Sequence, residues 1–233
     1  MAKREEKSVH SLAVYSEKLR GRDITNYEPI LQEMINSHTV LNAMYRYNPT
    51  VFYISNLADG KFVYFSQESM RKLLHLNDEG MEKMKQEGIH YMMSLILPSD
   101  LPAVVEDLGK LSLDAMKGIP AHQLDKIRFS INYRSSRNDG SVCKVLNQYC
   151  FIPDINDGMA LFSVGSLTDI TDIKSDTKIT IKAEYFDELH NHAPVINTVS
   201  PRDEQGLIFS ERELEIIKLL AEGLDVDSHQ TFH

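Results

Sequence analysis

Hydrophobic and polar positions change their spacing several times along this chain, and the changes predict where helices and strands lie. Between residues 26 and 44, apolar side chains recur at helix-like intervals, which predicts a helix ahead of the main domain. The apolar stripe of this helix needs a partner, either the sheet behind it or a second copy of the protein. Residues 51–54 and 62–65 are typical of two strands joined at the turn Asp59-Gly60.

A short helix is predicted next, over residues 67–76, with Met70, Leu73 and Leu74 facing inward. A segment rich in Lys, Glu and Met follows it. Four methionines gather there and just beyond: Met81, Met84, Met92 and Met93. Such soft side chains can line an adaptable cavity for an apolar ligand, or they can simply fill the core, which is the simpler interpretation.

A longer helix is predicted to begin near residue 100, where Ser99 or Asp100 can cap its first turn. Gly118 and Pro120 end it. One face of this helix carries an apolar stripe that predicts burial: Leu101, Val104, Val105, Leu108, Leu111 and Ala115.

The period then changes to two. Residues 127–134 alternate apolar and polar side chains, as a half-buried strand does, and residues 142–151 and 159–167 are predicted to be two more strands. Turns at Asp139-Gly140 and 154–158 separate them. The order of elements predicts an α+β fold in which a five-stranded antiparallel sheet carries short helices on one face. An additional strand is possible within 177–185.

Composition and charge exclude several classes of protein. No apolar run approaches the roughly 20 residues of a membrane-spanning helix, so no membrane partner is expected. Cys143 and Cys150 are the only cysteines, and both fall in one predicted strand, which favours a reducing cytoplasm over a disulfide framework. The net charge of −9 is unusual for a chain built to hold nucleic acid.

No motif for catalysis is present: the sequence has no phosphate-binding glycine loop, no nucleophile elbow and no paired-histidine metal helix. Asp100, Asp139 and Asp169 fall at predicted caps and turns, which already accounts for carboxylates there. We therefore expect a protein that is not an enzyme.

Three motifs within residues 47–175 resemble those of the PAS domain family. Residues 96–101 (Ile-Leu-Pro-Ser-Asp-Leu) look like the sequence at which the family's long helix begins, with Leu97 where a histidine often stands. Residues 133–141 resemble its strand–Asp-Gly–strand hairpin, and residues 165–172 contain Asp169-Ile170-Thr171, which resembles the family's closing signature. The resemblance implies a PAS-like sensor domain in which Asp169, Ile170 and Thr171 form the exit for the signal.

A second resemblance covers residues 209–224, which look like the first helix of a LuxR/GerE-type helix-turn-helix. Ser210 and Glu213 form a capping box at its start, and Gly223 supplies a stop. The apolar face of this helix contains Leu214, Ile217, Leu220, Ala221 and Leu224. In the family this helix is the scaffold, and the helices that contact DNA follow it.

Here the chain departs from the family's pattern, because only nine residues, largely polar and acidic, follow Leu224. Residues 201–233 also carry three basic side chains against eight acidic ones. We therefore expect that this chain lacks the recognition helix and does not bind DNA specifically by itself. The predicted organisation is a polar N-terminus with a flanking helix (1–46), the PAS-like domain (47–175), a linker (176–206) and an incomplete helix-turn-helix (207–233, first helix 211–223).

Sites for cofactors and metals are not expected. The cysteines lie seven residues apart in a strand and so face opposite sides, unlike a flavin-binding thiol on a helix. His90 and His122 could approach a haem, but solvated or capping histidines are the simpler interpretation. Glu188, His190 and His192 share a face if extended, yet no fourth ligand is near, so a polar linker is expected.

The sequence leads to two hypotheses of function. In the first, the chain is the sensory part of a cytoplasmic PAS–LuxR transcriptional regulator, which senses a small ligand or a partner and forms a homodimer through the helix at 26–44 and the sheet. In the second, it is a PAS module for protein–protein interaction that never touches DNA. The acidic C-terminal segment favours the second.

Overall fold

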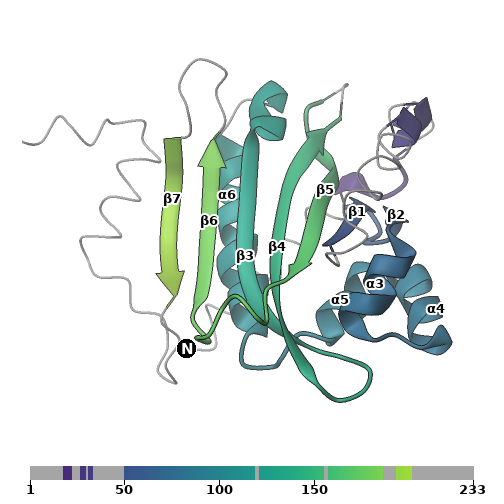
Figure 1. Ribbon diagram of the computed structural model, residues 1–233. Helices are drawn as coiled ribbons and strands as arrows, with labels where there is room; N and C mark the ends of the chain where they lie inside the picture. Colours follow the sequence, from purple (N-terminus) through teal and green to yellow (C-terminus); the bar gives the residue numbers. More distant parts are fainter. Residues whose placement is uncertain are drawn as a thin grey trace, which may run out of the picture. The chain divides into compact units, whose positions relative to one another are not determined.

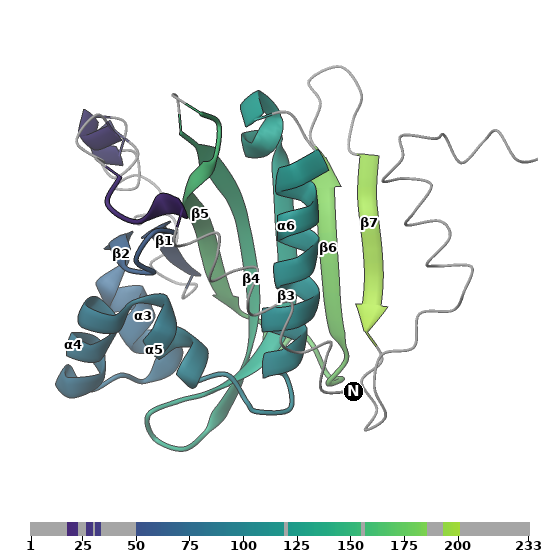
Figure 2. The same cartoon turned by 180° about the vertical axis from the view of Figure 1, so that it is seen from behind.

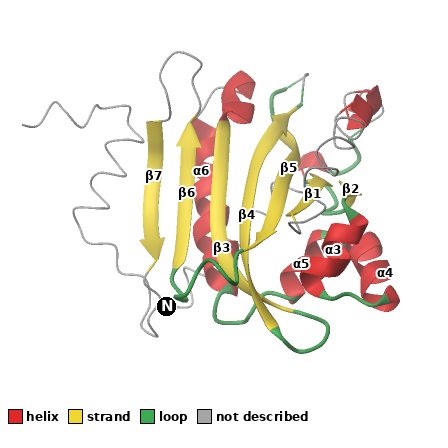
Figure 3. Ribbon diagram, in the orientation of Figure 1, coloured by secondary structure: helices red, strands yellow, loops and turns green. Residues whose placement is uncertain are grey.

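The computed structural model describes residues 18–22, 27–29, 31–33, 50–118, 121–154, 157–185 and 193–200, of which 114–118, 121–122 and 193–200 are described by their backbone alone. A single sheet carries the fold (Figures 1 and 3). In the order of the sheet, the strands are β2 (Phe62–Phe65), β1 (Thr50–Asn56), β5 (Ala160–Asp169), β4 (Val142–Pro153), β3 (Ile127–Ser136), β6 (Ile179–Tyr185) and β7 (Ala193–Ser200).

The five strands β1 to β5 are the antiparallel sheet that the sequence predicts, and the α+β class is confirmed. Strand β6 is the additional strand that the sequence allows within 177–185, and it pairs antiparallel with β3. Strand β7 follows β6 in the sheet and falls among residues for which the sequence predicts a linker. The sequence pattern does not predict this strand, because its polar residues and proline break the apolar alternation. An edge strand does not require that alternation.

Helices cover one face of the sheet, as Figure 2 shows from behind. The short helices α3 (Gln67–Leu74), α4 (Asp78–Glu87) and α5 (Ile89–Ser94) lie near β1 and β2, and α6 (Gly109–Gly118) lies over β3 and beside β6. Two other helical turns flank α6: the π-helical stretch Ala103–Leu108 and the 3₁₀ stretch Ala121–Lys126. None of the helices in the described part of the chain is long and apolar enough to span a bilayer.

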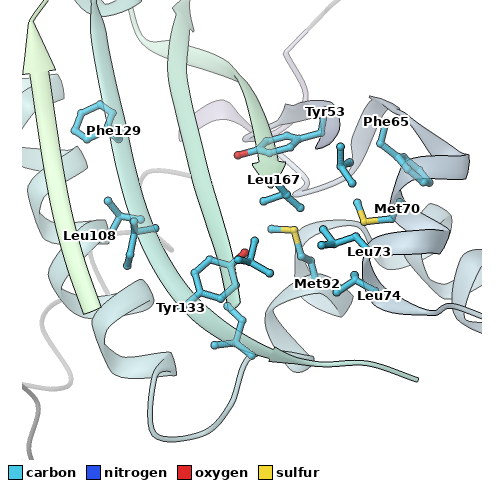
Figure 4. Close-up of a cluster of buried hydrophobic side chains, with 14 of the residues drawn as sticks. Tyr53, Phe65, Met70, Leu73, Leu74, Met92, Leu108, Phe129, Tyr133 and Leu167 are labelled. Atoms are coloured by element: carbon cyan, nitrogen blue, oxygen red, sulfur yellow. The ribbon is translucent and has the colours of Figure 1, made fainter. Parts of the chain in front are cut away.

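The main core fills the space between these helices and the sheet (Figure 4). Met70, Leu73 and Leu74 are buried in it, as the spacing of α3 predicts. Of the methionines of α4 and α5, Met81, Met84 and Met92 belong to the same cluster, and Met93 packs against it. The predicted long helix is only partly regular: Leu108 is buried, Val104 and Val105 are half-buried within the π-helical stretch, and Leu111 is half-buried in α6.

The opposite face of the sheet carries a second apolar cluster near β1 and β5. Leu19, Tyr27 and Leu31 pack there on Ile54, Leu161 and Phe162. The Tyr27 and Phe162 rings meet edge to face with centroids 5.4 Å apart. Tyr27 and Leu31 belong to the predicted helix at 26–44, of which only residues 27–29 and 31–33 are described. For these two side chains the partner is the protein's own sheet.

Candidate functional site

Four polar side chains meet inside the main core, on the helix-facing side of the sheet. They are Tyr53 on β1, Tyr133 on β3, and Asn147 and Tyr149 on β4, and we call them the tyrosine–asparagine cluster. Side chains alternate between the two faces of a strand, so Asn147 and Tyr149, two residues apart, face the same way. Figure 4 shows Tyr53 and Tyr133 beside Leu167 and the helix-borne Met92.

Only part of this cluster is hydrogen-bonded. The Tyr53 hydroxyl donates to Oδ1 of Asn147 at 2.9 Å, across the intervening strand β5. The Tyr149 hydroxyl pairs with Oγ of Ser112 on α6 at 2.8 Å. The Tyr133 side chain is 3% exposed, and neither its hydroxyl nor the Asn147 amide nitrogen has a hydrogen-bond partner among the described residues. Buried polar groups without partners are uncommon, so these two stand out.

The environment keeps the phenols uncharged. Burial raises the pKa of Tyr53, Tyr133 and Tyr149 above the ordinary value of a tyrosine. The neighbouring phenols of Tyr149 and Tyr133 raise the pKa of Tyr53 further. At neutral pH the cluster therefore presents neutral hydroxyl donors.

Gly165 on β5 makes the Tyr53–Asn147 contact possible. It pairs with Tyr53 on one side and with Tyr149 on the other. A Cβ atom at this position would lie 2.6 Å from the Tyr53 hydroxyl and 2.6 Å from the Gln148 carbonyl oxygen. Only a glycine at position 165 leaves room for the Tyr53 ring to cross over β5 and reach Asn147.

The residues predicted as the signal exit form a compact turn at the end of β5. Oδ1 of Asp169 accepts from the Thr171 backbone N–H at 2.9 Å and from the Thr171 hydroxyl at 2.5 Å. Strand β4 holds this turn, because the Lys144 N–H donates to the Thr171 hydroxyl oxygen at 3.0 Å and the Ile170 N–H donates to the Lys144 carbonyl at 2.8 Å. The turn is therefore fixed to the sheet by hydrogen bonds to β4.

Arg137, which the sequence did not single out, joins this turn to helix α3. Its Nη2 donates to Oδ2 of Asp169 at 2.5 Å, and its Nε donates to the Leu73 carbonyl at 3.0 Å. Both ends of the ion pair are mostly buried, at 16% and 17% exposure. A second link runs parallel to it, since the Asn138 N–H donates to the Leu74 carbonyl at 2.9 Å. The end of α3, the β3–β4 hairpin and the exit turn form one connected unit.

The carboxylates of Asp139 and Asp100 differ in their partners: Asp139 binds within its own turn and to a histidine, whereas Asp100 binds an arginine of β3. Asp139 lies in the predicted turn, where its carboxylate accepts from Ser141 and contacts Nδ1 of His75 at 2.6 Å. These bonds, first from Ser141 and then from His75, lower its pKa. The expectation that Asp100 or Ser99 caps the following helix is wrong, because the Asp100 carboxylate binds Arg134 instead. Arg134 occupies both carboxylate oxygens of Asp100, in a pair in which donor and acceptor are both ionised.

Other candidates from the sequence do not join the cluster. Cys143 is buried and Cys150 is half-buried, both are free thiols, and their hydrogens point to the Ser135 and Val164 carbonyls. His90 is exposed, next to Gly60. The described residues contain no group of three or more His, Cys, Asp or Glu side chains placed to hold a metal.

Some of the predicted residues lie outside the described part of the chain. These are the His122 side chain, the residues considered for a metal (Glu188, His190, His192) and the helix-turn-helix scaffold (Ser210, Glu213, Leu214, Ile217, Leu220, Gly223).

Comparison with known proteins adds similarities of shape alone. Neither a family model nor a curated protein matches the chain. Among solved structures, the N-terminal domain of a diguanylate cyclase with PAS/PAC sensor from Marinobacter aquaeolei is 17% identical, with a TM-score of 0.41 over 52% of this chain and 95% of that one. A PAS domain from Colwellia psychrerythraea is 15% identical, with a TM-score of 0.39 over 57% of this chain and 98% of that one.

A sensory box histidine kinase/response regulator from Burkholderia thailandensis is 18% identical, with a TM-score of 0.38 over 58% of this chain and 86% of that one. TM-scores and identities this low do not assign a function to this chain. The α+β class rests on the strand order and packing described above.

Proposed function

We propose that this chain is the sensory part of a signal-responsive transcriptional regulator of PAS–LuxR type. Its PAS-like core senses a small molecule or a partner, and the exit turn at Asp169-Ile170-Thr171 passes the change on to the C-terminal segment. The observation that carries the proposal is the position of Arg137, which binds helix α3 through Leu73 and the exit turn through Asp169.

Arg137 can act as a relay because its two partners belong to different elements around the sensing core. Helix α3 contributes three buried side chains to the core, so a molecule that enters the core displaces this helix. The Leu73 carbonyl moves with the helix. The hydrogen bond from Arg137 to this carbonyl and the ion pair of Arg137 with Asp169 can then no longer both keep their geometry. A buried ion pair has two discrete states, made and broken, which makes it suitable for a switch.

The regulatory proposal is tested by mapping chromosomal DNA bound by the tagged full-length gene product in its native host. We expect discrete sites whose occupancy changes in Arg137→Met, because the exit turn loses its link to α3. Lys83→Met removes an ion pair of similar length on the exposed face of α4, and it serves as the matched control. Unchanged occupancy in Arg137→Met would contradict the proposed relay.

The rival function, a protein–protein interaction module, is favoured by the acidic residues 201–233. Absence of any specific DNA site would support it, and a gel shift with this chain and with a longer reading frame separates the two further. Binding by the longer form alone supports the regulator.

A homodimer belongs to the same proposal, because readers of paired half-sites are usually dimeric. Light scattering of the purified protein tests this point, and a monomer at high concentration would contradict it.

A further inference from the structure

The tyrosine–asparagine cluster holds more hydrogen-bond donors than the protein around it accepts. Oδ1 of Asn147 accepts a hydrogen bond from the Tyr53 hydroxyl. The amide nitrogen of Asn147 carries two donor hydrogens and has no hydrogen-bond partner among the described residues. The Tyr133 hydroxyl is a further donor without a partner there. The Tyr53 contact assigns the orientation of the Asn147 amide: with Oδ1 toward Tyr53 the phenol proton has an acceptor, whereas the opposite orientation would leave both that proton and Oδ1 without a partner in the part of the chain that the structure describes.

The two unpartnered donors lie close enough to serve one acceptor. Asn147 pairs with Ile131 across β3 and β4, and Tyr133 pairs with Val145, so Tyr133 and Asn147 are diagonal neighbours on the same face. Diagonal neighbours in an antiparallel pair are about 7–8 Å apart at Cα, within reach of a tyrosine side chain. A carbonyl oxygen has two lone pairs and can accept from both.

The surroundings select against a charged ligand. Among the residues that the structure describes, no Lys, Arg or His side chain is buried, and the core around the cluster is made of apolar side chains and neutral phenols. The guanidiniums of Arg134 and Arg137, on and just after β3, are bound to Asp100 and Asp169. A carboxylate in the cluster would therefore lose its hydration without gaining a cation, which is strongly unfavourable.

We propose that the tyrosine–asparagine cluster binds a small, uncharged molecule whose carbonyl oxygen accepts hydrogen bonds from the Asn147 amide nitrogen and the Tyr133 hydroxyl. The proposal rests on the function proposed above and names the ligand class of the same core. The methionines of α4 and α5 complete the site, because flexible side chains adapt to the apolar part of such a molecule.

The test uses pairs of probe molecules that differ only in the acceptor. Acetophenone and butanone carry the carbonyl, whereas α-methylstyrene and 2-methyl-1-butene replace its oxygen by a CH₂ group. Benzoate replaces the methyl group of acetophenone by an anionic oxygen. Each probe is titrated into the full chain while the side-chain amide resonances of Asn147 are followed by NMR. We expect at least one ketone to bind about tenfold more tightly than its alkene, as one or two net hydrogen bonds allow, and benzoate not to bind.

Variants identify the donors. Asn147→Leu should abolish the preference for ketone over alkene, and Tyr133→Phe should reduce it. Gln148→Leu is the matched control, because this neighbouring amide faces the other side of the sheet and donates to Ser130 at 3.2 Å. The preference should survive in Gln148→Leu.

Three outcomes would overturn the ligand assignment: equal binding of ketone and alkene, no response of the Asn147 amide to either ketone, or a preference that persists in Asn147→Leu. If one of these occurs while DNA occupancy still depends on Arg137, the ligand chemistry alone is wrong. If the ketone preference is found but occupancy does not depend on Arg137, the proposed relay is wrong and the ligand assignment stands.

Discussion

The Tyr53 hydroxyl donates to Oδ1 of Asn147 at 2.9 Å directly across strand β5, where Gly165 leaves room for the ring. This contact links β1 to β4 inside the main core, in addition to the backbone hydrogen bonds that join both strands to β5. It also determines which atom of Asn147 stays available.

Gly165→Ala should destabilise the protein by about 1–3 kcal/mol, the usual cost of forcing an extra carbon into a packed core. The added Cβ would overlap the Tyr53 hydroxyl and the Gln148 carbonyl, and a strand backbone cannot yield easily. Urea denaturation measures the change. Gly80→Ala in α4 is the control: its new Cβ would meet only side-chain ends at 3.2–3.3 Å, and a free energy of unfolding close to wild type is expected.

Removing the hydroxyls of Tyr133 and Tyr149 should have opposite effects on stability. Tyr133→Phe removes a buried hydroxyl without a described partner, so the free energy of unfolding should rise by about 1 kcal/mol. Tyr149→Phe leaves Ser112 without its partner and should lower it by about 1 kcal/mol. Equal destabilisation by both would show that Tyr133 is bonded in solution.

The pH dependence of folding should report the Asp100–Arg134 pair. Burial opposes ionisation of Asp100, but hydrogen bonds from Arg134 and Ser99 outweigh it and lower the pKa. A carboxyl whose pKa is lowered by folding stabilises the protein above its unfolded pKa of about 3.9, and this stability is lost as the pH falls through the folded pKa. Asp100→Asn should therefore flatten the loss of stability below about pH 4. An unchanged slope in acid denaturation would contradict the ion pair.

Much of the sheet could be predicted from the sequence, and the relations between its polar residues could not. The alternation at 127–134 and the turn residues at 139–140 predict β3 and β4, because a half-buried strand imposes that period. Strand β7 could not be predicted, since its residues 193–200 include a proline and no clear alternation. Local pattern also assigned Asp100 to a cap, although its partner Arg134 lies 34 residues away.

The tyrosine–asparagine cluster was missed for the same reason. Tyr53 and Asn147 are 94 residues apart, and nothing near either residue indicates the other. Asn147 did carry a usable signal, because it stands at an inward position of a strand that is otherwise apolar on that side. An amide at a core position has to find partners, so the sequence alone can mark such a residue as a candidate for a site.

The N-terminal segment should be held on the sheet by Arg22. Its guanidinium binds Asp154 at 2.7 Å and Asp157 at 2.6 Å, and the Tyr27 hydroxyl donates to Asp154 at 2.9 Å. Arg22→Met should speed amide exchange in residues 18–33 and cost about 1–2 kcal/mol, because Asp154 is nearly buried. Lys85→Met, which removes a loose surface pair on α4, should leave this exchange unchanged.

The most direct test of the account is whether a small change in α3 reaches the exit turn through Arg137. Met70→Leu alters the buried face of α3 at nearly constant volume, and NMR follows the backbone amides of Ile170, Ile173 and Lys174. We predict that Met70→Leu shifts these resonances in the presence of Arg137 and that the shifts largely disappear in the Arg137→Met background. Shifts of equal size in both backgrounds would contradict the relay from α3 to Asp169.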